Sequence, residues 1–86
     1  SHLQLADSFF LQKNYREAKK EFLAVHILYK FPEFQAPALF QAAACQEKLR
    51  EPGEAIKTRE LLIRQFPDSP FATRAKQQLR RRPTTP

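Results

Sequence analysis

The sequence predicts an all-α fold of antiparallel helix hairpins stacked on one another, and three observations point to it. Apolar residues recur every three to four positions along nearly the whole chain, and no segment alternates with a period of two. Proline, asparagine, aspartate and serine separate the helical stretches and leave connections of two to five residues. Related sequence returns after 35 to 37 residues. Helices joined by such short connections are expected to pack as antiparallel neighbours.

The first two helices are expected at about residues 3–12 and from Asn14 to a point before Pro32. Asn14 is followed three positions later by Glu17, which is the pattern of a capping box that satisfies two N–H groups at a helix start. The second helix has to stop before Pro32 because proline disfavours the helical conformation of the residue that precedes it. Its apolar stripe consists of Tyr15, Ala18, Phe22, Val25 and Tyr29.

The other three helices are each expected to begin near a proline, whose missing N–H costs little in the first turn. Pro37 lies near the expected start of the third helix, Pro52 opens the fourth, and Pro70 follows the capping residues of the fifth. The fourth helix is expected to end at Pro67 and the fifth at about Arg81. Their apolar stripes are Ala38, Ala42, Cys45 and Leu49, then Ala55, Ile56, Leu62, Ile63 and Phe66, then Phe71, Ala75 and Leu79.

Two parts of the chain carry related residues at matching places. Arg16-Glu17-Ala18 matches Gly53-Glu54-Ala55, and Phe31-Pro32-Glu33 matches Phe66-Pro67-Asp68. This interval and these residues resemble the tetratricopeptide repeat family, in which helix pairs stack into a superhelical solenoid. The positions that fall on the family pattern are His2, Leu5, Ala6, Phe9, Ala18, Phe22 and Pro32 in the first unit, and Leu39, Ala42, Ala43, Gln46, Ala55, Arg59 and Pro67 in the second.

The resemblance implies a tetratricopeptide-like superhelix of about two repeats plus a C-terminal closing helix. The expected units are residues 2–34 and 35–68, followed by a closing helix at 69–81, and together they form one domain over residues 1–81. Residues 82–86 are expected to be a disordered, basic and proline-rich tail. The second unit departs from the family pattern because Gln46 and Arg59 stand where the family has aromatic residues.

The composition excludes several kinds of site. A single glycine rules out a glycine-rich phosphate loop, and one cysteine with two histidines cannot supply a four-ligand zinc site or an internal disulfide. We expect Cys45 and His26 to have structural roles, and we expect the scattered carboxylates to lie on a solvated surface. The longest uncharged stretch, residues 34–46, has 13 residues and is too short and too polar to span a bilayer. We expect no enzyme activity, no metal and no cofactor.

The net charge of +6 is concentrated at the C-terminal end. Residues 1–73 carry ten basic and nine acidic side chains, and the remaining five basic ones are Arg74, Lys76, Arg80, Arg81 and Arg82. This basic helix leaves an anionic surface or nucleic acid as an alternative ligand. No aromatic residues alternate with these arginines, which disfavours the stacking platform of a single-strand binder.

By the resemblance, the first helix of each unit lines a concave surface that binds a protein or peptide partner. Phe10 and Phe40 stand out because they lie outside the apolar stripes, which makes each either a binding anchor or a contact to a missing neighbouring repeat. On the last helix, Arg74, Gln78 and Arg81 share a face and form a basic lip. The other expected binding residues are Leu3, Asp7 and Leu11 in the first unit, and Pro37, Gln41, Ala44, Glu47 and Lys48 in the second.

The amino-acid sequence of residues 54–72 is similar to that of tetratricopeptide domains in bacterial envelope proteins, namely the periplasmic Tol-Pal-associated proteins and the outer-membrane-assembly lipoproteins. This resemblance implies a place in the periplasm or cell envelope, and the residues themselves leave the cytoplasm open. Two and a half units are fewer than the three that such stacks usually need. The end around Leu5 and Phe10 would then be uncovered, which predicts dimerisation or marginal stability.

Overall fold

The computed structural model describes residues 2–80, and over this range it contains five α-helices and no strand. The predicted all-α architecture is confirmed for this part of the chain. Arg81 and the tail at 82–86 lie outside the described residues, as does the side chain of Leu3. The helices are α1 (His2–Leu11), α2 (Tyr15–Leu28), α3 (Pro32–Lys48), α4 (Pro52–Gln65) and α5 (Pro70–Arg80).

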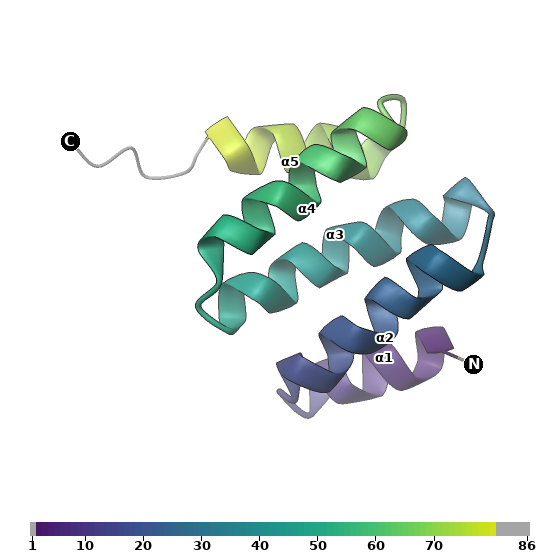
Figure 1. Cartoon of the computed structure of the whole chain (residues 1–86), viewed down its shortest axis with the longest axis vertical. Coiled ribbons are helices and arrows are strands. Elements are labelled where there is room, and N and C mark those ends of the chain that lie inside the picture. Colours follow the sequence, from purple (N-terminus) through teal and green to yellow (C-terminus); the bar gives the residue numbers. More distant parts are fainter. Residues whose placement is uncertain (1, 81–86) are drawn as a thin grey trace.

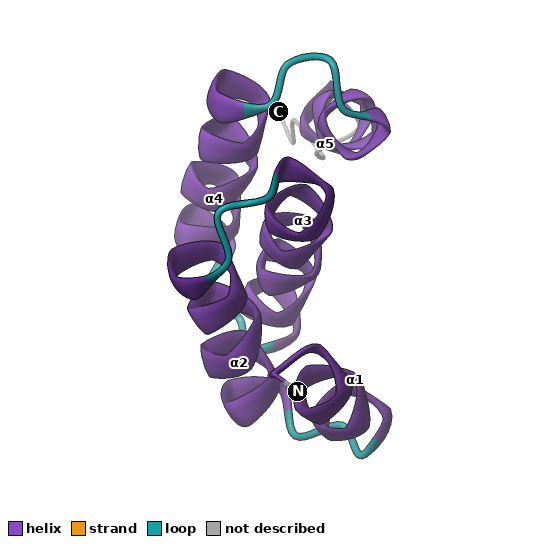
Figure 2. Cartoon of the chain, turned by 90° about the vertical axis from the view of Figure 1, so that its right-hand side faces the viewer, coloured by secondary structure: helices purple, strands orange, loops and turns teal. Residues whose placement is uncertain are grey.

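The helices form two layers, with α2 and α4 in one layer and α1, α3 and α5 in the other (Figure 2). Successive helices run antiparallel to one another along the stack (Figure 1), and each packs against the next one in the chain. In addition, α3 packs against α5. In the view of Figure 2, α1 and α5 project beyond α3 at the two ends of their layer. The layer of α1, α3 and α5 is therefore bowed, and we call its outer side the hollow face.

The turns within the two hairpins have the same geometry at an interval of 37 positions. Lys13 after α1 has a φ of 63°, and Arg50 after α3 has a φ of 62°. In both turns the N–H of the following residue donates to the carbonyl oxygen five positions earlier at 2.8 Å. This is the Schellman arrangement, in which glycine usually occupies the left-handed position. Lysine and arginine occupy this position here, and the left-handed conformation costs each of them about 1 kcal/mol of conformational free energy.

The predicted capping box at Asn14 is wrong, although Asn14 is the residue that precedes α2. Its side chain makes no capping hydrogen bond. Its own N–H is already used by the preceding turn, where it donates to the carbonyl oxygen of Phe9. This N–H is therefore not available to the Glu17 carboxylate, which in a capping box would accept from it. The Glu17 carboxylate instead pairs with Lys20 at 3.3 Å. The backbone carbonyl of Asn14 still accepts from the N–H of Ala18 at 3.0 Å.

The third helix begins at Pro32, and the prediction that it starts near Pro37 is wrong. Pro32 occupies the first helical position, where its lack of an N–H costs nothing. The residue before it, Phe31, is extended with φ of −111° and ψ of 121°. Pro37 lies inside the helix, where it removes the single bond that would reach back to Glu33. The sequence pattern missed this because one lost bond near a helix start is tolerated.

The starts of the last two helices agree with the predictions. Pro52 and Pro70 are the first residues of α4 and α5. At α5, the hydroxyl oxygen of Ser69 accepts a hydrogen bond from the N–H of Phe71 at 3.1 Å, which satisfies one donor of the first turn. The fourth helix ends at Gln65, just before the expected stop at Pro67.

Two clusters of buried side chains hold the layers together. Small residues dominate both clusters, which lets the helix axes approach closely. Ala18 of α2 and Ala55 of α4 are both fully buried, at the interval of 37 positions seen in the turns. The first cluster joins α1, α2 and α3 through Ala6, Ala18, Phe22, Val25, Ala38, Ala42 and Cys45. The second joins α3, α4 and α5 through Ala36, Leu39, Leu62, Ala72 and Ala75.

Candidate functional site

Helix α3 supplies the middle of the hollow face, because packing occupies its other sides. Ala38, Ala42 and Cys45 belong to the cluster shared with α1 and α2, and Leu39 belongs to the cluster shared with α4 and α5. The side that remains runs down the helix at spacings of four, three and four. We call it the α3 strip, and it consists of Pro37, Gln41 and Ala44, which are half-buried, and Lys48, which is exposed.

Three of the predicted binding side chains on α1 are described, namely Asp7, Phe10 and Leu11, and two of them are exposed. Asp7 is exposed and Leu11 is 83% exposed. Phe10 packs inward instead, with its ring edge-on to Tyr15 at 5.4 Å and to Phe22 at 6.5 Å between centroids. The expectation that Phe10 lies outside the packing is therefore wrong, because its ring closes the first core cluster.

On the other side of the strip, Phe40 joins α3 to α5. Its ring lies 5.5 Å from that of Phe71 between centroids, and both rings pack against the second core cluster. Phe40 therefore contacts a helix of this same chain, whereas its two expected roles were a binding anchor and a contact to a missing neighbouring repeat. The guanidinium carbon of Arg74 lies 6.0 Å from the Phe71 ring centroid, so aromatic packing also positions this cation. Arg74 and Gln78 are exposed on α5.

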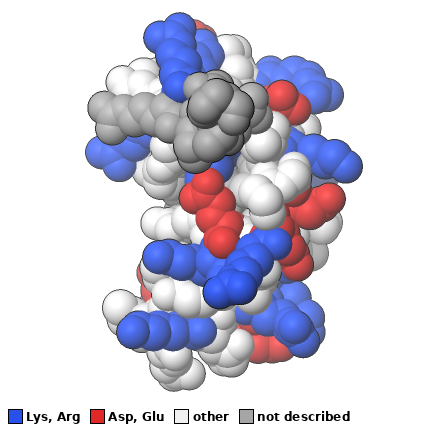
Figure 3. Space-filling model, turned by 90° about the vertical axis from the view of Figure 1, so that its left-hand side faces the viewer, with Lys and Arg blue, Asp and Glu red and all other residues white. Residues whose placement is uncertain are grey.

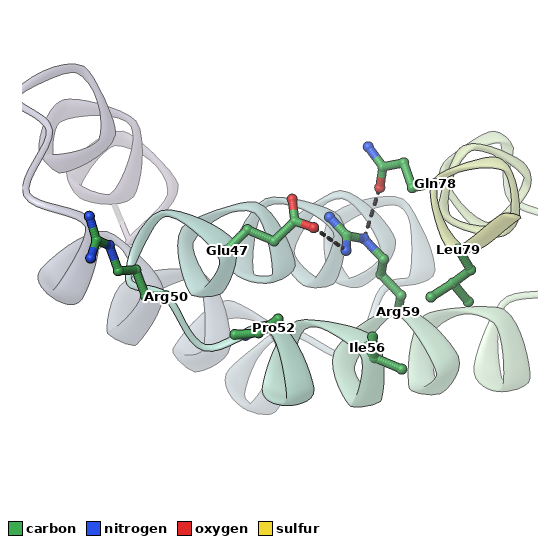
Figure 4. Close-up of a pocket in the computed structure, with 7 residues that line it drawn as sticks. All are labelled: Glu47, Arg50, Pro52, Ile56, Arg59, Gln78 and Leu79. Atoms are coloured by element: carbon green, nitrogen blue, oxygen red, sulfur yellow. Dashed lines mark hydrogen bonds and ion pairs between the residues drawn. The ribbon is translucent and has the colours of Figure 1, made fainter. Parts of the chain in front are cut away.

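A pocket of about 470 Å³ opens where α3, α4 and α5 meet (Figure 4). We call it the Arg59 pocket. Pro52 and Ile56 of α4 and Leu79 of α5 line it with apolar surface. Its polar lining consists of Glu47, Arg50, Arg59 and Gln78. Two of these, Glu47 and Gln78, were predicted as binding residues, so the pocket adjoins the hollow face.

Arg59 is the most buried of the pocket residues that the sequence prediction missed. It is only 4% exposed, and its guanidinium ties three helices together (Figure 4). Its Nε donates to Oε1 of Gln78 at 2.9 Å, and its Nη1 donates to Oε2 of Glu47 at 2.8 Å. The hydrogen bond from Arg59 is the main reason that the pKa of the Glu47 carboxyl lies below its ordinary value. An arginine in an aromatic position of the repeat pattern was the feature that could have identified this network.

The neighbouring contact between α3 and α4 is also polar. Gln46, the other departure from the aromatic pattern, is buried, and its Oε1 lies 2.6 Å from the hydroxyl oxygen of Thr58. That hydroxyl oxygen also lies 3.0 Å from the carbonyl oxygen of Glu54. The second hairpin therefore uses hydrogen bonds where the first uses aromatic rings.

The remaining candidate residues for chemistry have structural surroundings. Burial raises the pKa of the Cys45 thiol to about 11, against a smaller opposing effect of Lys19, so it stays protonated at neutral pH. Nε2 of His26 lies 3.0 Å from Oε1 of Gln65 and links α2 to α4. Residues 2–80 contain no group of three or more histidine, cysteine or acidic side chains placed to hold a metal ion. None of the helices in this range has the length and apolar character that crossing a bilayer requires.

Charge is mixed on the end of the molecule where α3 gives way to α4. Figure 3 shows lysine and arginine side chains spread over this end, with acidic side chains between them. Lys19 of α2 pairs with Glu51 at 3.1 Å, and Lys57 pairs with Glu54 at 3.7 Å. The described part of this end therefore has no single basic field, and the unbalanced cations belong to α5, which contains Arg74, Lys76 and Arg80 and no acidic residue.

Comparison with protein families supports the repeat interpretation for the second hairpin. Residues 37–69 match the family model of the tetratricopeptide repeat. The match begins at Pro37 within α3 and ends in the connection before α5. The comparisons with curated proteins and with solved structures gave no match. Residues 37–69, within the hairpin of α3 and α4, are therefore similar to a tetratricopeptide repeat, a kind of helix pair that generally mediates interactions between proteins.

Proposed function

We propose that this chain is a non-enzymatic interaction module that binds a protein or peptide on the hollow face of α1, α3 and α5. The α3 strip is the observation that carries the proposal, because it is the side of α3 left over after packing on both neighbours. Its central residue, Ala44, is small and half-buried, so a bound chain can approach the helix backbone there. The tetratricopeptide match over residues 37–69 supports the same role.

The proposed contacts differ along the face. Asp7 and Leu11 provide an acidic and an apolar contact at the α1 end, and Arg74 provides a cation at the α5 end. Phe10 and Phe40 support the face from below, since their rings pack into the two clusters. The full set of proposed contact residues is Asp7, Leu11, Pro37, Gln41, Ala44, Glu47, Lys48, Arg74 and Gln78, with Arg81 beyond the described residues.

The division into units and the cellular setting are part of this proposal. We propose units at 2–34 and 35–68 with a closing helix at 69–81. The two matching turns at Lys13 and Arg50 support a repeat interval of 37 positions, although α3 starts at Pro32, before the proposed boundary. The resemblance of residues 54–72 to envelope proteins supports a bacterial envelope setting, as part of a larger protein. Self-association through an uncovered end is a further outcome that the exposed side chain of Leu5 would allow.

An anionic surface or nucleic acid is the second candidate ligand. The observation in its favour is that α5 carries three basic side chains and no acidic one. Binding to phosphate groups would weaken steeply as salt is raised. A hollow face that grips apolar side chains would hold its partner in moderate salt.

Affinity capture from native extract, at low and moderate salt, tests the proposal with two matched variants. Ala44→Arg fills the middle of the α3 strip, whereas Ala24→Arg makes the same change at a half-buried position of α2 in the other layer. We avoid Phe40 because its ring packs on Phe71. We expect a partner that survives moderate salt, binds the Ala24→Arg variant and is lost with Ala44→Arg. Capture of the same partner by the Ala44→Arg variant would refute binding at the hollow face. Loss of capture at moderate salt would favour binding through the basic helix α5.

A further inference from the structure

The Arg59 pocket combines apolar walls with a buried guanidinium that has unused donors. An arginine side chain has five N–H groups, and the bonds to Gln78 and Glu47 use one on Nε and one on Nη1. Nη2 makes no hydrogen bond to the described residues. No buried side-chain nitrogen or oxygen in that part of the chain lacks a partner, so Nη2 keeps some solvent-accessible surface. Arg59 lines the pocket, and this surface is the part of its guanidinium that a ligand can reach. An oxygen acceptor that enters the pocket can therefore bind Arg59 without breaking either existing bond.

The charge of the lining favours an anion with a single charge. Arg50 and Arg59 outnumber Glu47, and Arg50 makes no ion pair within the described residues. The Glu47 carboxylate lies 2.8 Å from the same guanidinium, so it would repel a phosphate dianion more strongly than a carboxylate. A carboxylate is thus the acceptor that this pocket suits best.

The apolar part of the lining requires an apolar group beside that carboxylate. Ile56 of α4 and Leu79 of α5 are half-buried and both line the pocket (Figure 4). Burial of a leucine-sized side chain between them removes further apolar surface from water. Glu47 and Gln78 belong to the pocket and to the proposed hollow face, so a chain that lies along α3 reaches the pocket directly.

We propose that the Arg59 pocket receives an apolar side chain of the bound polypeptide, with the carboxylate of an adjacent aspartate or glutamate hydrogen-bonded to Nη2 of Arg59. This inference rests on the proposed function and states what sequence feature the partner presents at the α5 end of the face. The proposed occupant is an internal segment of the partner, whose side-chain carboxylate meets Nη2 of Arg59, and a chain end is a separate outcome of the test below.

The test uses blocked tetrapeptides and the whole 86-residue chain labelled with ¹⁵N. The probe is acetyl-Ala-Leu-Glu-Ala-amide, and the matched controls replace its glutamate with glutamine or its leucine with alanine. So small a ligand is expected to bind with a Kd on the order of 1 mM. We expect chemical shift changes at Ile56, Arg59 and Leu79, and at least a threefold weaker affinity for each control peptide. Equal affinity for the glutamate and glutamine peptides would overturn the inference.

Variants of the chain locate the two halves of the interaction. Arg59→Met is expected to abolish the preference for glutamate over glutamine, while Arg64→Met, at an exposed position of the same helix, leaves it unchanged. Ile56→Ser is expected to abolish the preference for leucine over alanine and to retain the native Arg59 signals, so the test does not depend on one variant remaining folded. A preference that survives both pocket variants would overturn the assignment of the site.

Two further outcomes separate this inference from its alternatives. Binding of acetyl-Ala-Leu with a free carboxyl group, but not of the blocked peptide, would overturn the internal segment in favour of a chain end. A captured partner that depends on Ala44 but not on Arg59 or Ile56 would refute the pocket and leave the hollow face standing. If the peptide binds at Arg59 and the Ala44→Arg variant still captures the partner, the result would support the pocket as a binding site and refute binding at the hollow face.

Discussion

Phe22 and Arg59 occupy equivalent positions in the two hairpins and show how differently one fold can be filled. They lie 37 positions apart, at the interval that also separates the fully buried Ala18 and Ala55. Phe22 is 2% exposed and meets the ring of Phe10. Arg59 is 4% exposed and meets a carboxylate and an amide. Both hairpins have a close helix crossing at an alanine. The large side chain beside that crossing is aromatic in the first hairpin, at Phe22, and charged in the second, at Arg59.

This difference separates a stabilising region from a binding region. Rings that pack edge-on close the space around Phe22. The planar guanidinium of Arg59 reaches its partners at the ends of long side chains and leaves a pocket of about 470 Å³ beside it. We therefore expect substitutions in the core around Phe22 to change the free energy of unfolding, and those around Arg59 to change binding.

The largest effect is expected for Phe22→Ala. Removing a buried ring leaves a cavity in the first cluster, and such changes reduce the free energy of unfolding by about 3–5 kcal/mol. Urea denaturation of the pure chain measures it. Phe31→Ala is the control, because Phe31 is 59% exposed, and a change of less than about 1 kcal/mol is expected there. Similar losses for both variants would show that the first cluster is not the stabilising region.

Ala18→Leu and Ala55→Leu are each expected to reduce the free energy of unfolding by about 1–3 kcal/mol, because neither close crossing has room for a larger side chain. Thermal melts of the two variants beside Ala24→Leu, at a half-buried position, provide the comparison. If both variants melted like the unaltered chain, the equivalence of the two crossings would be refuted.

Lys13→Gly and Arg50→Gly are expected to raise the free energy of unfolding by about 1 kcal/mol each, because glycine adopts the left-handed conformation without steric cost. The two turns have φ angles of 63° and 62°, so the gains should be equal. Denaturation midpoints at constant slope measure them. A gain in one turn alone would break the match between the hairpins.

Arg59→Met is expected to change the free energy of unfolding by no more than about 1 kcal/mol. Its partner Glu47 is 54% exposed on its side chain, so the carboxylate becomes hydrated when the guanidinium is lost. The same denaturation experiment serves here, with Glu47→Gln as the companion variant. A loss as large as that of Phe22→Ala would make Arg59 a stabilising residue first and a binding residue second.

The smallest effect is a pH dependence that belongs to Glu47. Because Arg59 lowers the pKa of this carboxyl from 4.5, the stability that its ion pair contributes is present above about that pH and is lost as the pH falls through the lowered pKa. The difference in free energy of unfolding between the unaltered chain and Glu47→Gln should shrink between about pH 6 and pH 3. A constant difference would mean that the pair does not respond to protonation of Glu47.

The fold could be predicted from the sequence because its determinants are local. Apolar spacing identified every helix, and Pro52 and Pro70 marked helix starts correctly because a proline in the first turn costs no hydrogen bond. The same rule misplaced the start of α3, since it applies equally to Pro32 and Pro37. The capping box failed for a nonlocal reason, namely that the preceding turn uses the N–H of Asn14.

The site could be predicted less completely, because it depends on contacts between helices. Phe10 and Phe40 lie outside the apolar stripes of their own helices, but each packs against a ring on another helix. Arg59 was recognised as a departure from the repeat pattern, but its bonds reach 12 and 19 positions along the chain. Periodicity describes one helix at a time, and such partners appear only when three helices are in place.

The order in which the helices pack also has a consequence for how fast the chain folds. Apart from the contact of α3 with α5, each helix packs against its neighbour in the chain. The search for native contacts therefore involves only short loop closures, and proteins of this kind fold in microseconds to milliseconds. Each newly formed hairpin is a template for the next, so folding can start in either half and spread towards the other.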